Sequence, residues 1–461
     1  MRFGIFYEHQ LPRPWEDSSE LDLIQNALDQ CEAADKLGFD YVWEVEHHFL
    51  EEYSHSSAPE VFLAALSQRT KRIRLGHGIV QTPPPFNHPA RVAERVATLD
   101  LVSGGRVDFG TGESSSEAEL GGFGIDPIYK REMWEEGLRV AIRCMTETPF
   151  AGYTGRWVNM PPRNVVPKPV QKPHPPIWVA CSRRETIHLA AQKGVGALSF
   201  AFINPEEAHQ WVEDYYDTLA SECIPIGDAV NPNVAIVTPL MCCKTEDEAL
   251  ERGIEGGNFF GYSLAHYYVF GKHQPGVTDV WKEYVERRAE AGYSPEAVIE
   301  AAKNPDRLGA KVVGGDASGL RGAVGTPSQI RDFIRRYQEC GVDQIIFVSQ
   351  AGKNRHEHIM ESMELFAREV LPGFIDSQDR DDAKKKQRLE KVLDDAFARK
   401  PDSDHPDLVD PNYQFPAIPM GLADRMGNDQ FYSILGQVQD HAAIGDLQGF
   451  LENISNINPF S

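Results

Sequence analysis

The chain has no long apolar run, few cysteines and a shortage of basic residues. It lacks the stretch of about 20 apolar residues that a membrane-spanning helix needs, so we expect no membrane association. Its seven cysteines include no Cys-x-x-Cys pair, which argues against a zinc site, and a disulfide framework is not expected. The 46 basic residues are outnumbered by 69 acidic ones, and a formal charge of -23 argues against nucleic acid as a partner.

Several motifs are also absent. No Gly-x-Gly-x-x-Gly turn follows the first predicted strand at residues 2–6, which disfavours a doubly wound dinucleotide-binding sheet. There is no Gly-x-Ser-x-Gly nucleophile elbow. His356-Glu357-His358 is not His-Glu-x-x-His, and helix residues two apart do not face each other, so no metal site is expected there. The amino-terminal residues do not resemble a signal peptide, and we therefore expect a cytoplasmic protein.

What the chain does contain is a regular alternation of short apolar strands with amphipathic helices. Eight segments have strand character: residues 2–6, 39–43, 73–80, 106–109, 177–180, 196–200, 233–239 and 343–349. This order predicts an α/β fold, a (β/α)8 TIM barrel with insertions and a C-terminal extension. A doubly wound sheet is the alternative.

The alternation also suggests a division of the chain. We expect residues 1–375 to form the barrel and residues 376–461 to form an extension that packs on the barrel or on a neighbouring subunit. The pattern loosens across residues 255–325, which we interpret as an insertion that acts as a lid over the carboxyl ends of the strands.

Two histidines, His47 and His48, lie just past the carboxyl end of the second predicted strand. Barrel enzymes place their active sites at the carboxyl ends of the strands, so these residues are candidate catalytic groups. Adjacent residues that leave a strand point to opposite sides, so the two rings are not expected to bind one metal ion. An imidazole has a pKa near about 6.5, which predicts a neutral ring at neutral pH. A structural histidine bonded to a loop carbonyl is the alternative.

Two further segments could approach a cofactor. Gly110 and Gly112 follow the fourth predicted strand, where glycine allows the backbone to approach a ring or a phosphate; an ordinary flexible loop fits equally well. Ser182, Arg183 and Arg184 stand where the fifth predicted strand leads into a helix. The free amides at a helix start favour a phosphate, although solvated charges are the alternative.

Taken together, these places resemble the bacterial luciferase-like family of flavin-dependent monooxygenases. The resemblance covers residues 1–374. It rests on Glu46-His47-His48-Phe49, on residues 75–80 followed by Asn87-His88-Pro89-Ala90-Arg91, on residues 99–110, and on the closing stretch at residues 361–374.

The resemblance implies a (β/α)8 barrel, usually dimeric, that uses reduced FMN from a separate NAD(P)H:flavin reductase. Such an enzyme oxygenates a small organic substrate with O2 through a C4a-(hydro)peroxyflavin. The family's catalytic histidine falls on His47, its non-proline cis peptide bond under the flavin falls on His77-Gly78, and its backbone phosphate site falls on Cys181, Ser182 and Glu185.

One residue departs from the family pattern. Where luciferases carry an arginine that pairs with the FMN phosphate, this chain has Glu113. Either Glu113 turns away and Arg183 or Arg184 takes its place, or the cofactor differs. An F420-dependent oxidoreductase of the same superfamily is therefore one alternative, and a non-catalytic flavin-binding partner subunit is another.

Overall fold

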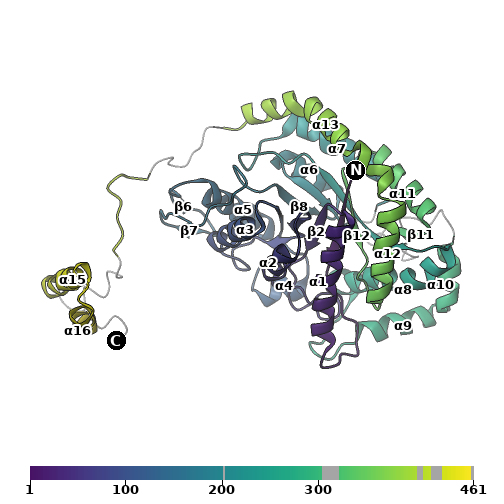
Figure 1. Ribbon diagram of the computed structural model, residues 1–461, viewed down its shortest axis with the longest axis horizontal. Helices are drawn as coiled ribbons and strands as arrows, with labels where there is room; N and C mark the ends of the chain where they lie inside the picture. Colours follow the sequence, from purple (N-terminus) through teal and green to yellow (C-terminus); the bar gives the residue numbers. More distant parts are fainter. Residues whose placement is uncertain (201–202, 304–320, 402–408, 417–427, 458–461) are drawn as a thin grey trace. The chain divides into compact units, whose positions relative to one another are not determined.

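The computed structural model describes residues 1–200, 203–303, 321–401, 409–416 and 428–457 (Figure 1). The chain forms two compact units, Met1–His405 and Pro406–Ser461. The first unit contains the barrel, which has the following strands: β1 (Arg2–Tyr7), β2 (Tyr41–Glu44), β3 (Arg74–His77), β5 (Val107–Gly112), β8 (Ile177–Cys181), β9 (Gly196–Ser199), β10 (Val234–Cys242) and β12 (Gln344–Val348).

These eight parallel strands close into a ring. Each strand pairs with the next along the chain, and β12 pairs with both β10 and β1. The predicted (β/α)8 barrel is thereby confirmed. The third predicted strand divides into β3 and a two-residue strand, β4 (Val80–Gln81), which pairs with the end of β5. Because β5 extends to Gly112, both Gly110 and Gly112 lie in a strand and not in the loop that was expected.

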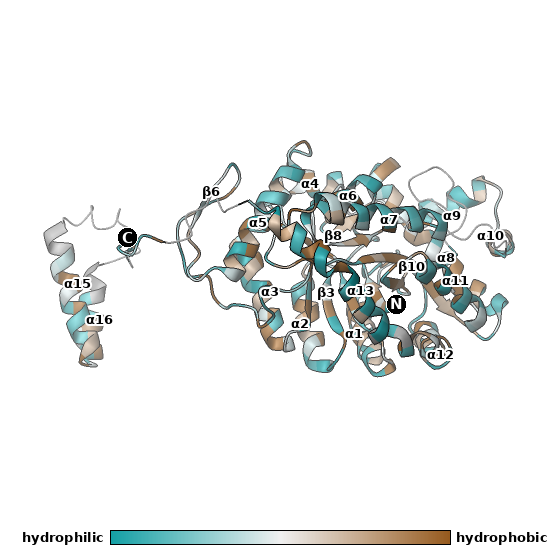
Figure 2. Ribbon diagram, turned by 90° about the horizontal axis from the view of Figure 1, so that it is seen from above, coloured by the Kyte–Doolittle hydropathy of each residue, from teal (hydrophilic) through white to brown (hydrophobic). Residues whose placement is uncertain are grey.

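Helices surround the barrel as Figure 2 shows, with their hydrophobic faces turned toward the strands. The barrel helices are α1 (Ser19–Leu37), α2 (Pro59–Arg69), α3 (Pro89–Ser103), α5 (Lys130–Thr146), α6 (Arg184–Lys193), α7 (Pro205–Glu222), α8 (Glu246–Ala265), α11 (Pro327–Glu339) and α12 (His356–Glu369). Short elements are α4 (Glu117–Gly122) and the hairpin of β6 (Tyr153–Thr154) and β7 (Asn159–Met160). Proline in the first turn starts several of these helices because its missing N–H costs nothing there.

Two indole rings fill the interior of the barrel. Trp43 and Trp178 are almost fully buried and meet edge to face, with ring centroids 5.4 Å apart. A Cβ atom at Gly76 would lie 2.3 Å from Trp43, and one at Gly196 would lie 2.3 Å from Trp178. Because glycine stands beside each indole, the interior is packed solid, and the barrel is open to chemistry only at its ends.

The insertion at residues 255–325 is largely helical instead of loose. The end of α8 runs into a π-helix, η1 (His266–Phe270), followed by α9 (Val280–Glu290), α10 (Pro295–Ala302) and β11 (Ala323–Gly325), which pairs with β10. Residues 304–320 lie outside the described part. The sequence pattern did not reveal α9 because only Val280 and Tyr284 of its 11 residues are buried, too few for an apolar stripe.

Two carboxylates of the loop after β2 hold this insertion in place. Glu51 accepts a hydrogen bond from the Gly276 amide (2.7 Å) and lies 3.1 Å from Nε2 of His273. Glu52 is fully buried and accepts from the amides of Val280 and Trp281 at the start of α9, where the helix dipole favours a negative charge. The insertion is therefore tied to the loop that also carries His47 and His48.

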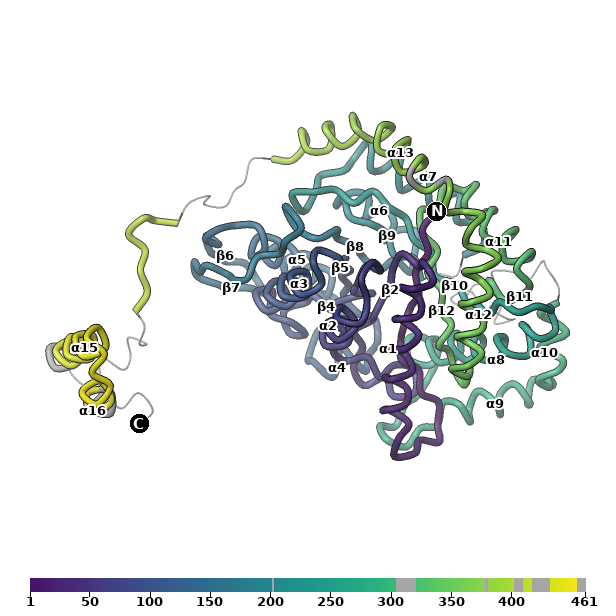
Figure 3. Tube along the Cα trace, in the orientation of Figure 1, coloured from purple at the N-terminus to yellow at the C-terminus, as the bar shows by residue number. Residues whose placement is uncertain are grey.

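The chain leaves the barrel through a long helix, α13 (Pro372–Ala398), whose course Figure 3 follows. This helix belongs to the first unit and packs on the barrel: Asp382 lies 2.5 Å from Arg2, and Lys385 lies 2.6 Å from Asp343. The second unit contains α15 (Asn428–Ala443) and α16 (Leu447–Ile457), which pack against each other. Among the described helices, none is both long enough and apolar enough to cross a membrane.

We predict that Gly110→Ala destabilises the protein by about 1–3 kcal/mol, the usual cost of overpacking a well-filled interior. A Cβ atom at this position would lie only 1.9 Å from the carbonyl oxygen of His77, so a strand must shift to admit it. Urea unfolding of both proteins measures the difference. Gly373→Ala in α13 is the control, since its Cβ would meet no atom within 4 Å. Equal stability of Gly110→Ala and the parent would contradict the close contact of β3 with β5.

Candidate functional site

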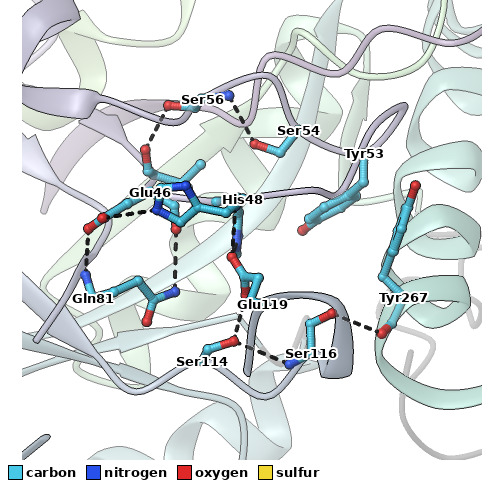
Figure 4. A network of polar contacts seen from close by, with 12 residues as sticks. Glu46, His48, Tyr53, Ser54, Ser56, Gln81, Ser114, Ser116, Glu119 and Tyr267 are labelled. Carbon is cyan, nitrogen blue, oxygen red and sulfur yellow. Dashed lines mark hydrogen bonds and ion pairs between the residues drawn. The ribbon is translucent and has the colours of Figure 1, made fainter. Parts of the chain in front are cut away.

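Ionisable side chains gather at the carboxyl end of the barrel, in the segments that follow β1, β2 and β5. Glu8 follows β1, Glu46 to His48 follow β2, and Glu119 stands in α4 after β5. Figure 4 shows Glu119 between the end of β2 and the Ser114–Ser116 turn, with Tyr53 and Tyr267 beside it. Ends of parallel strands in a barrel meet at one face, which explains why residues so distant in the sequence come together.

His47 lies between two buried carboxylates. Its Nδ1 is 3.0 Å from Oε1 of Glu119, and its Nε2 is 3.4 Å from Oε2 of Glu8. The imidazole side chain is 14% exposed, whereas Glu119 is fully buried and Glu8 nearly so. The ring therefore keeps an opening to the outside while both of its nitrogens face negative charge.

This environment decides the charge of the ring. Burial lowers the pKa of His47, but the charges of Glu8 and Glu119 outweigh burial and raise it to about 9. A pKa of about 9 favours the imidazolium form at neutral pH, in contrast to the neutral ring expected from a free imidazole. Sequence reasoning could not have found this, because Glu119 is 72 positions away from His47 in the chain.

The two carboxylates differ in their own ionisation. Burial raises the pKa of Glu8 to about 7, although His47 and a hydrogen bond from Tyr53 (2.9 Å) act in the opposite direction. For Glu119, burial would raise the pKa, but His47, Ser114 and the His48 amide together lower it. Near neutral pH, Glu119 is thus a fixed negative charge, while Glu8 exchanges a proton readily.

Sequence reasoning missed both carboxylates. Glu8 directly follows the first predicted strand, and the argument that singled out His47 applies to it equally. Glu119 lies in the glycine- and serine-rich stretch after the fourth predicted strand, whose composition is typical of a loop. The Ser-x-x-Glu spacing of Ser116 and Glu119 is a helix-start signal and could have indicated α4.

His48 has different neighbours, as the alternation of adjacent residues predicts. Its Nε2 lies 3.2 Å from Glu46, and its ring packs near Phe86 and Phe123. Glu46 in turn accepts hydrogen bonds from the Gln81 amide (2.7 Å) and the Asn87 side chain. These contacts fix His48 in the wall beside the site. A catalytic role for His48 stays a prediction.

Aromatic side chains border His47 on the side of the insertion. The Tyr53 ring lies 5.7 Å from the His47 ring, and the Tyr268 ring of η1 lies 6.4 Å from it, centroid to centroid. Ser116 donates a hydrogen bond to the backbone carbonyl of Tyr267 at 3.3 Å (Figure 4). The π-helix of the insertion therefore contacts the catalytic candidates directly.

The expected cis peptide bond at His77-Gly78 is wrong. Within the described part of the chain, every cis bond precedes a proline. In the trans form, the Gly78 amide donates to the Glu44 carbonyl at 2.6 Å, so β3 and β2 stay paired without the cost of a non-proline cis bond. The His77 side chain is buried near Glu60 of α2, and burial lowers its pKa to about 4.

Gly110 and Gly112 serve close packing between strands. The space beside Gly110 is taken by the His77 carbonyl, and a Cβ at Gly112 would lie 2.6 Å from Ile79. A direct contact of these two glycines with a cofactor stays a prediction.

Glu113, the residue that departs from the family pattern, is paired with cations. Arg131 binds both of its oxygens, at 2.6 and 2.8 Å, and Nζ of Lys130 lies 3.5 Å away. Its negative charge is therefore compensated within the protein. The expectation that Glu113 is withdrawn from a phosphate is consistent with this pairing.

The other predicted phosphate ligands lie at the start of α6, and they differ in exposure and in their bonding partners. Arg184 is paired with Asp214 of α7, whereas Arg183 has no carboxylate partner among the described residues. The thiol of Cys181 is buried and donates to the Thr186 carbonyl, and burial raises its pKa to about 12. Ser182, Arg183 and Glu185 are exposed at the helix start.

The charges at this helix start suit a phosphate monoester. Burial lowers the pKa of Lys130, Glu113 acts in the opposite direction, and Arg131 and then Arg183 add smaller lowering effects, which places Arg183 near Lys130. Lys130, Arg131 and Arg183 thus outnumber Glu113, and the amides at the start of α6 lack helical acceptors, apart from that of Thr186, which donates to the Arg183 carbonyl. In the described part of the chain, no group of three or more His, Cys, Asp or Glu side chains could hold a metal ion.

A parallel eight-stranded barrel with an ionisable cluster at its carboxyl end is the arrangement of TIM-barrel enzymes. The family model described as "Luciferase-like monooxygenase" matches residues 1–344. The chain therefore belongs to the luciferase-like monooxygenase family.

Individual relatives agree with this assignment. The chain is 26% identical over 388 residues to the oxygenase component of the flavin-dependent trigonelline monooxygenase of Acinetobacter baylyi, covering 82% of this chain and 97% of that protein. Monooxygenase RslO1 from Streptomyces bottropensis matches with a TM-score of 0.60 and 25% identity, over 81% of this chain and 100% of that one.

The fold also occurs in an enzyme with a different cofactor. The coenzyme F420 dependent tetrahydromethanopterin reductase from Methanopyrus kandleri matches with a TM-score of 0.54 and 22% identity, over 81% of this chain and 99% of that one. The cofactor of this chain thus has to be argued from its own residues. The homodimer that the resemblance implies stays a prediction.

We predict that Glu119→Gln lowers the pKa of His47 from about 9 by about 1 to 3 pH units. The change removes the charge 3.0 Å from Nδ1 and keeps the size of the side chain. Because the imidazolium form persists up to the pKa, it should be lost at lower pH in the variant. NMR titration of the ¹³C-labelled histidine Cε1 signals measures this, with the His47 signal assigned by its absence in His47→Asn.

Glu117→Gln is the matched control for this experiment. Glu117 lies on the same short helix but is exposed. An unchanged His47 titration in Glu119→Gln, or the same decrease in both variants, would contradict the assigned contact.

Proposed function

We propose that this chain is the FMN-dependent oxygenase component of a two-component monooxygenase. It would take reduced FMN from a separate NAD(P)H:flavin reductase and oxygenate a small organic substrate with O2. When bound, the reduced flavin supplies the electrons that activate oxygen. The single observation that carries the proposal is the His47 ring, held between Glu8 and Glu119 at the active end of the barrel.

The chain's own residues would divide the work as follows. Lys130, Arg131 and Arg183, with the start of α6, would bind the phosphate of FMN, which is a dianion. His47 would hold a proton at Nε2, the nitrogen farther from its carboxylate partner, and donate it to a bound oxygen species or product.

Glu8 would return that proton. Its pKa of about 7 keeps it partly protonated at neutral pH, and it lies 3.4 Å from Nε2 of His47. Glu119 would stay ionised and keep the imidazole oriented. Tyr53 and Tyr268 would exclude water from the same face of the ring.

Two considerations favour FMN over F420. The relative from Acinetobacter baylyi is the oxygenase component of a flavin-dependent monooxygenase, and it aligns over 97% of its length. The cationic site at the start of α6 consists of Lys130, Arg131 and Arg183, with one of these charges compensated by Glu113, and so few cations suit one phosphate better than the longer acidic tail of F420.

The function can be tested before the substrate is known. The purified chain is supplied with FMN, NADH and a flavin reductase, and a bacterial small-molecule extract is added under ¹⁸O2. The proposal expects protein-dependent products that carry one ¹⁸O atom, found by mass spectrometry. Parallel incubation with F420 and mass spectrometry of the bound cofactor separates the two cofactors. A stoichiometric FMN complex without labelled product would favour the non-catalytic partner subunit.

We predict that His47→Ala retains FMN but forms the labelled product about 10²-fold more slowly or worse, the scale of a lost acid–base group. Flavin fluorescence titration measures binding, and single-turnover product formation measures the rate. His209→Ala, an exposed histidine on α7, is the control for loss of an imidazole. A rate equal to that of the parent would remove His47 from the chemistry.

We predict that Arg183→Ala weakens FMN binding about tenfold, as expected for loss of a charged hydrogen-bond donor, and leaves riboflavin binding unchanged. Riboflavin lacks the phosphate and so reports on everything except this contact. Arg184→Ala is the matched control, since that side chain is already paired with Asp214. An equal loss of both ligands in Arg183→Ala would place Arg183 outside the phosphate site.

A further inference from the structure

Two histidines of the insertion contact each other where the insertion meets the barrel. His266 belongs to η1, and His273 lies in the segment that follows it. Nε2 of His266 lies 3.4 Å from Nδ1 of His273. The His266 side chain is fully buried, and that of His273 is 15% exposed. This histidine pair lies outside the candidate site and has no part in the proposed chemistry.

A carboxylate stands at each end of the histidine pair. Nδ1 of His266 lies 3.3 Å from Oε2 of Glu283 in α9, and Nε2 of His273 lies 3.1 Å from Oε1 of Glu51. Glu51 belongs to the loop after β2, which also carries His47. The order Glu283, His266, His273, Glu51 therefore links α9 and η1 to the loop beside the candidate site.

The other ionisable groups that face the pair come from the loops after β1 and β2, from α8 and from η1: Arg13, Glu52, Tyr262 and Tyr267. Arg13 lies 2.7 Å from Glu51, which compensates its charge. Burial raises the pKa of both phenols, so neither is ionised near neutral pH. Within this set, the two histidines are the groups whose ordinary pKa falls between about pH 5 and 8.

The contact between the two rings has room for one proton. An imidazole–imidazole hydrogen bond needs an N–H on one nitrogen and a lone pair on the other, so the two facing nitrogens cannot both be protonated. One positive charge on the pair gives each outer nitrogen an N–H toward its carboxylate. A second proton would take the last lone pair and set two N–H groups against each other at 3.4 Å. The closed arrangement therefore tolerates one positive charge on the pair and is opposed by two.

The surroundings also act against the second proton while the insertion is closed. Burial lowers the pKa of His266; Glu283 acts in the opposite direction, and His273 lowers it further. A histidine whose pKa is depressed in the closed form stabilises that form above its ordinary pKa of about 6.5, and this contribution is lost as the pH falls. Acid therefore favours an arrangement in which the rings are separated.

We propose that the His266–His273 pair is an acid-sensitive latch, a contact that holds the insertion closed near neutral pH. A second proton, taken up from the solvent, breaks the contact between the rings and loosens η1 and residues 271–278 from the loop after β2. Glu52 still accepts from the amides of Val280 and Trp281, so the movement is confined to the segment before α9. The latch does not depend on the function proposed above, because all of its groups belong to this chain.

Hydrogen–deuterium exchange with mass spectrometry on the full chain tests the latch. Labelling is done at about pH 7.5 and about pH 5, on either side of the ordinary histidine pKa, with times scaled for the intrinsic exchange rate. The proposal expects peptides within residues 262–280 to exchange about tenfold faster or more at the lower pH, the effect of one pKa unit, and peptides of β3 and β5 to be unchanged. No difference, or an equal acceleration in the strand peptides, would overturn it.

His273→Gln separates the latch from general effects of acid. Glutamine keeps a hydrogen-bonding side chain but takes up no proton. Whatever its exchange rate at neutral pH, the difference between the two pH values should therefore disappear within residues 262–280. His209→Gln is the matched control, because His209 also lies beside a carboxylate, 3.3 Å from Glu213, but on the surface of α7. An acid response in His273→Gln equal to that of the parent, or loss of the response in His209→Gln, would contradict the assignment.

Glu283→Gln provides a second measurement that keeps both histidines. Removing this charge makes protonation of the pair less favourable, so the midpoint of the acid-dependent exchange should move down by about 0.5 to 1 pH unit. Glu286→Gln, an exposed position on the same helix, is the control and should keep the midpoint of the parent. An unchanged or higher midpoint in Glu283→Gln, or the same decrease in both variants, would overturn the latch.

Discussion

A positively charged imidazole between two buried carboxylates is the interaction on which the active end of this barrel depends. Removing Glu8, His47 and Glu119 from water is unfavourable for each alone, and only their mutual pairing makes their burial tolerable. Each comes from a different element, so the barrel must close correctly before the three can meet. Charge compensation thereby links the geometry of β1, β2 and α4 to the chemistry of one ring.

The same principle recurs at the start of α6, where the proposed phosphate site lies. Glu113 would repel a phosphate if it stood alone, but Arg131 and Lys130 bind it and leave Arg183 uncompensated. The barrel interior leaves no room for a ligand, because Trp43 and Trp178 fill it. A ligand therefore has to bind outside the ring of strands. The acidic composition of the chain therefore says little about its sites, where local pairing sets the sign of the charge.

The sequence was sufficient for the barrel because each strand carries its own apolar pattern, which is a local property. It was also sufficient to single out His47, because the place of this residue just after a predicted strand is a local property as well. It could not reveal the charge state of His47, which depends on Glu119 and on burial. It missed α9 because few of its residues are buried, and it predicted a cis bond at His77-Gly78 by resemblance, where the strand pairing of Gly78 favours trans.

The attachment of the insertion by Glu51 and Glu52 has a consequence for how the insertion can move. These carboxylates belong to the same short loop as His47, and they hold the amides of Gly276, Val280 and Trp281. Any outward swing of the insertion must either break those bonds or drag the loop with it. In the proposed enzyme, a movement of the insertion would therefore also move the loop that carries His47, and the two would be mechanically coupled.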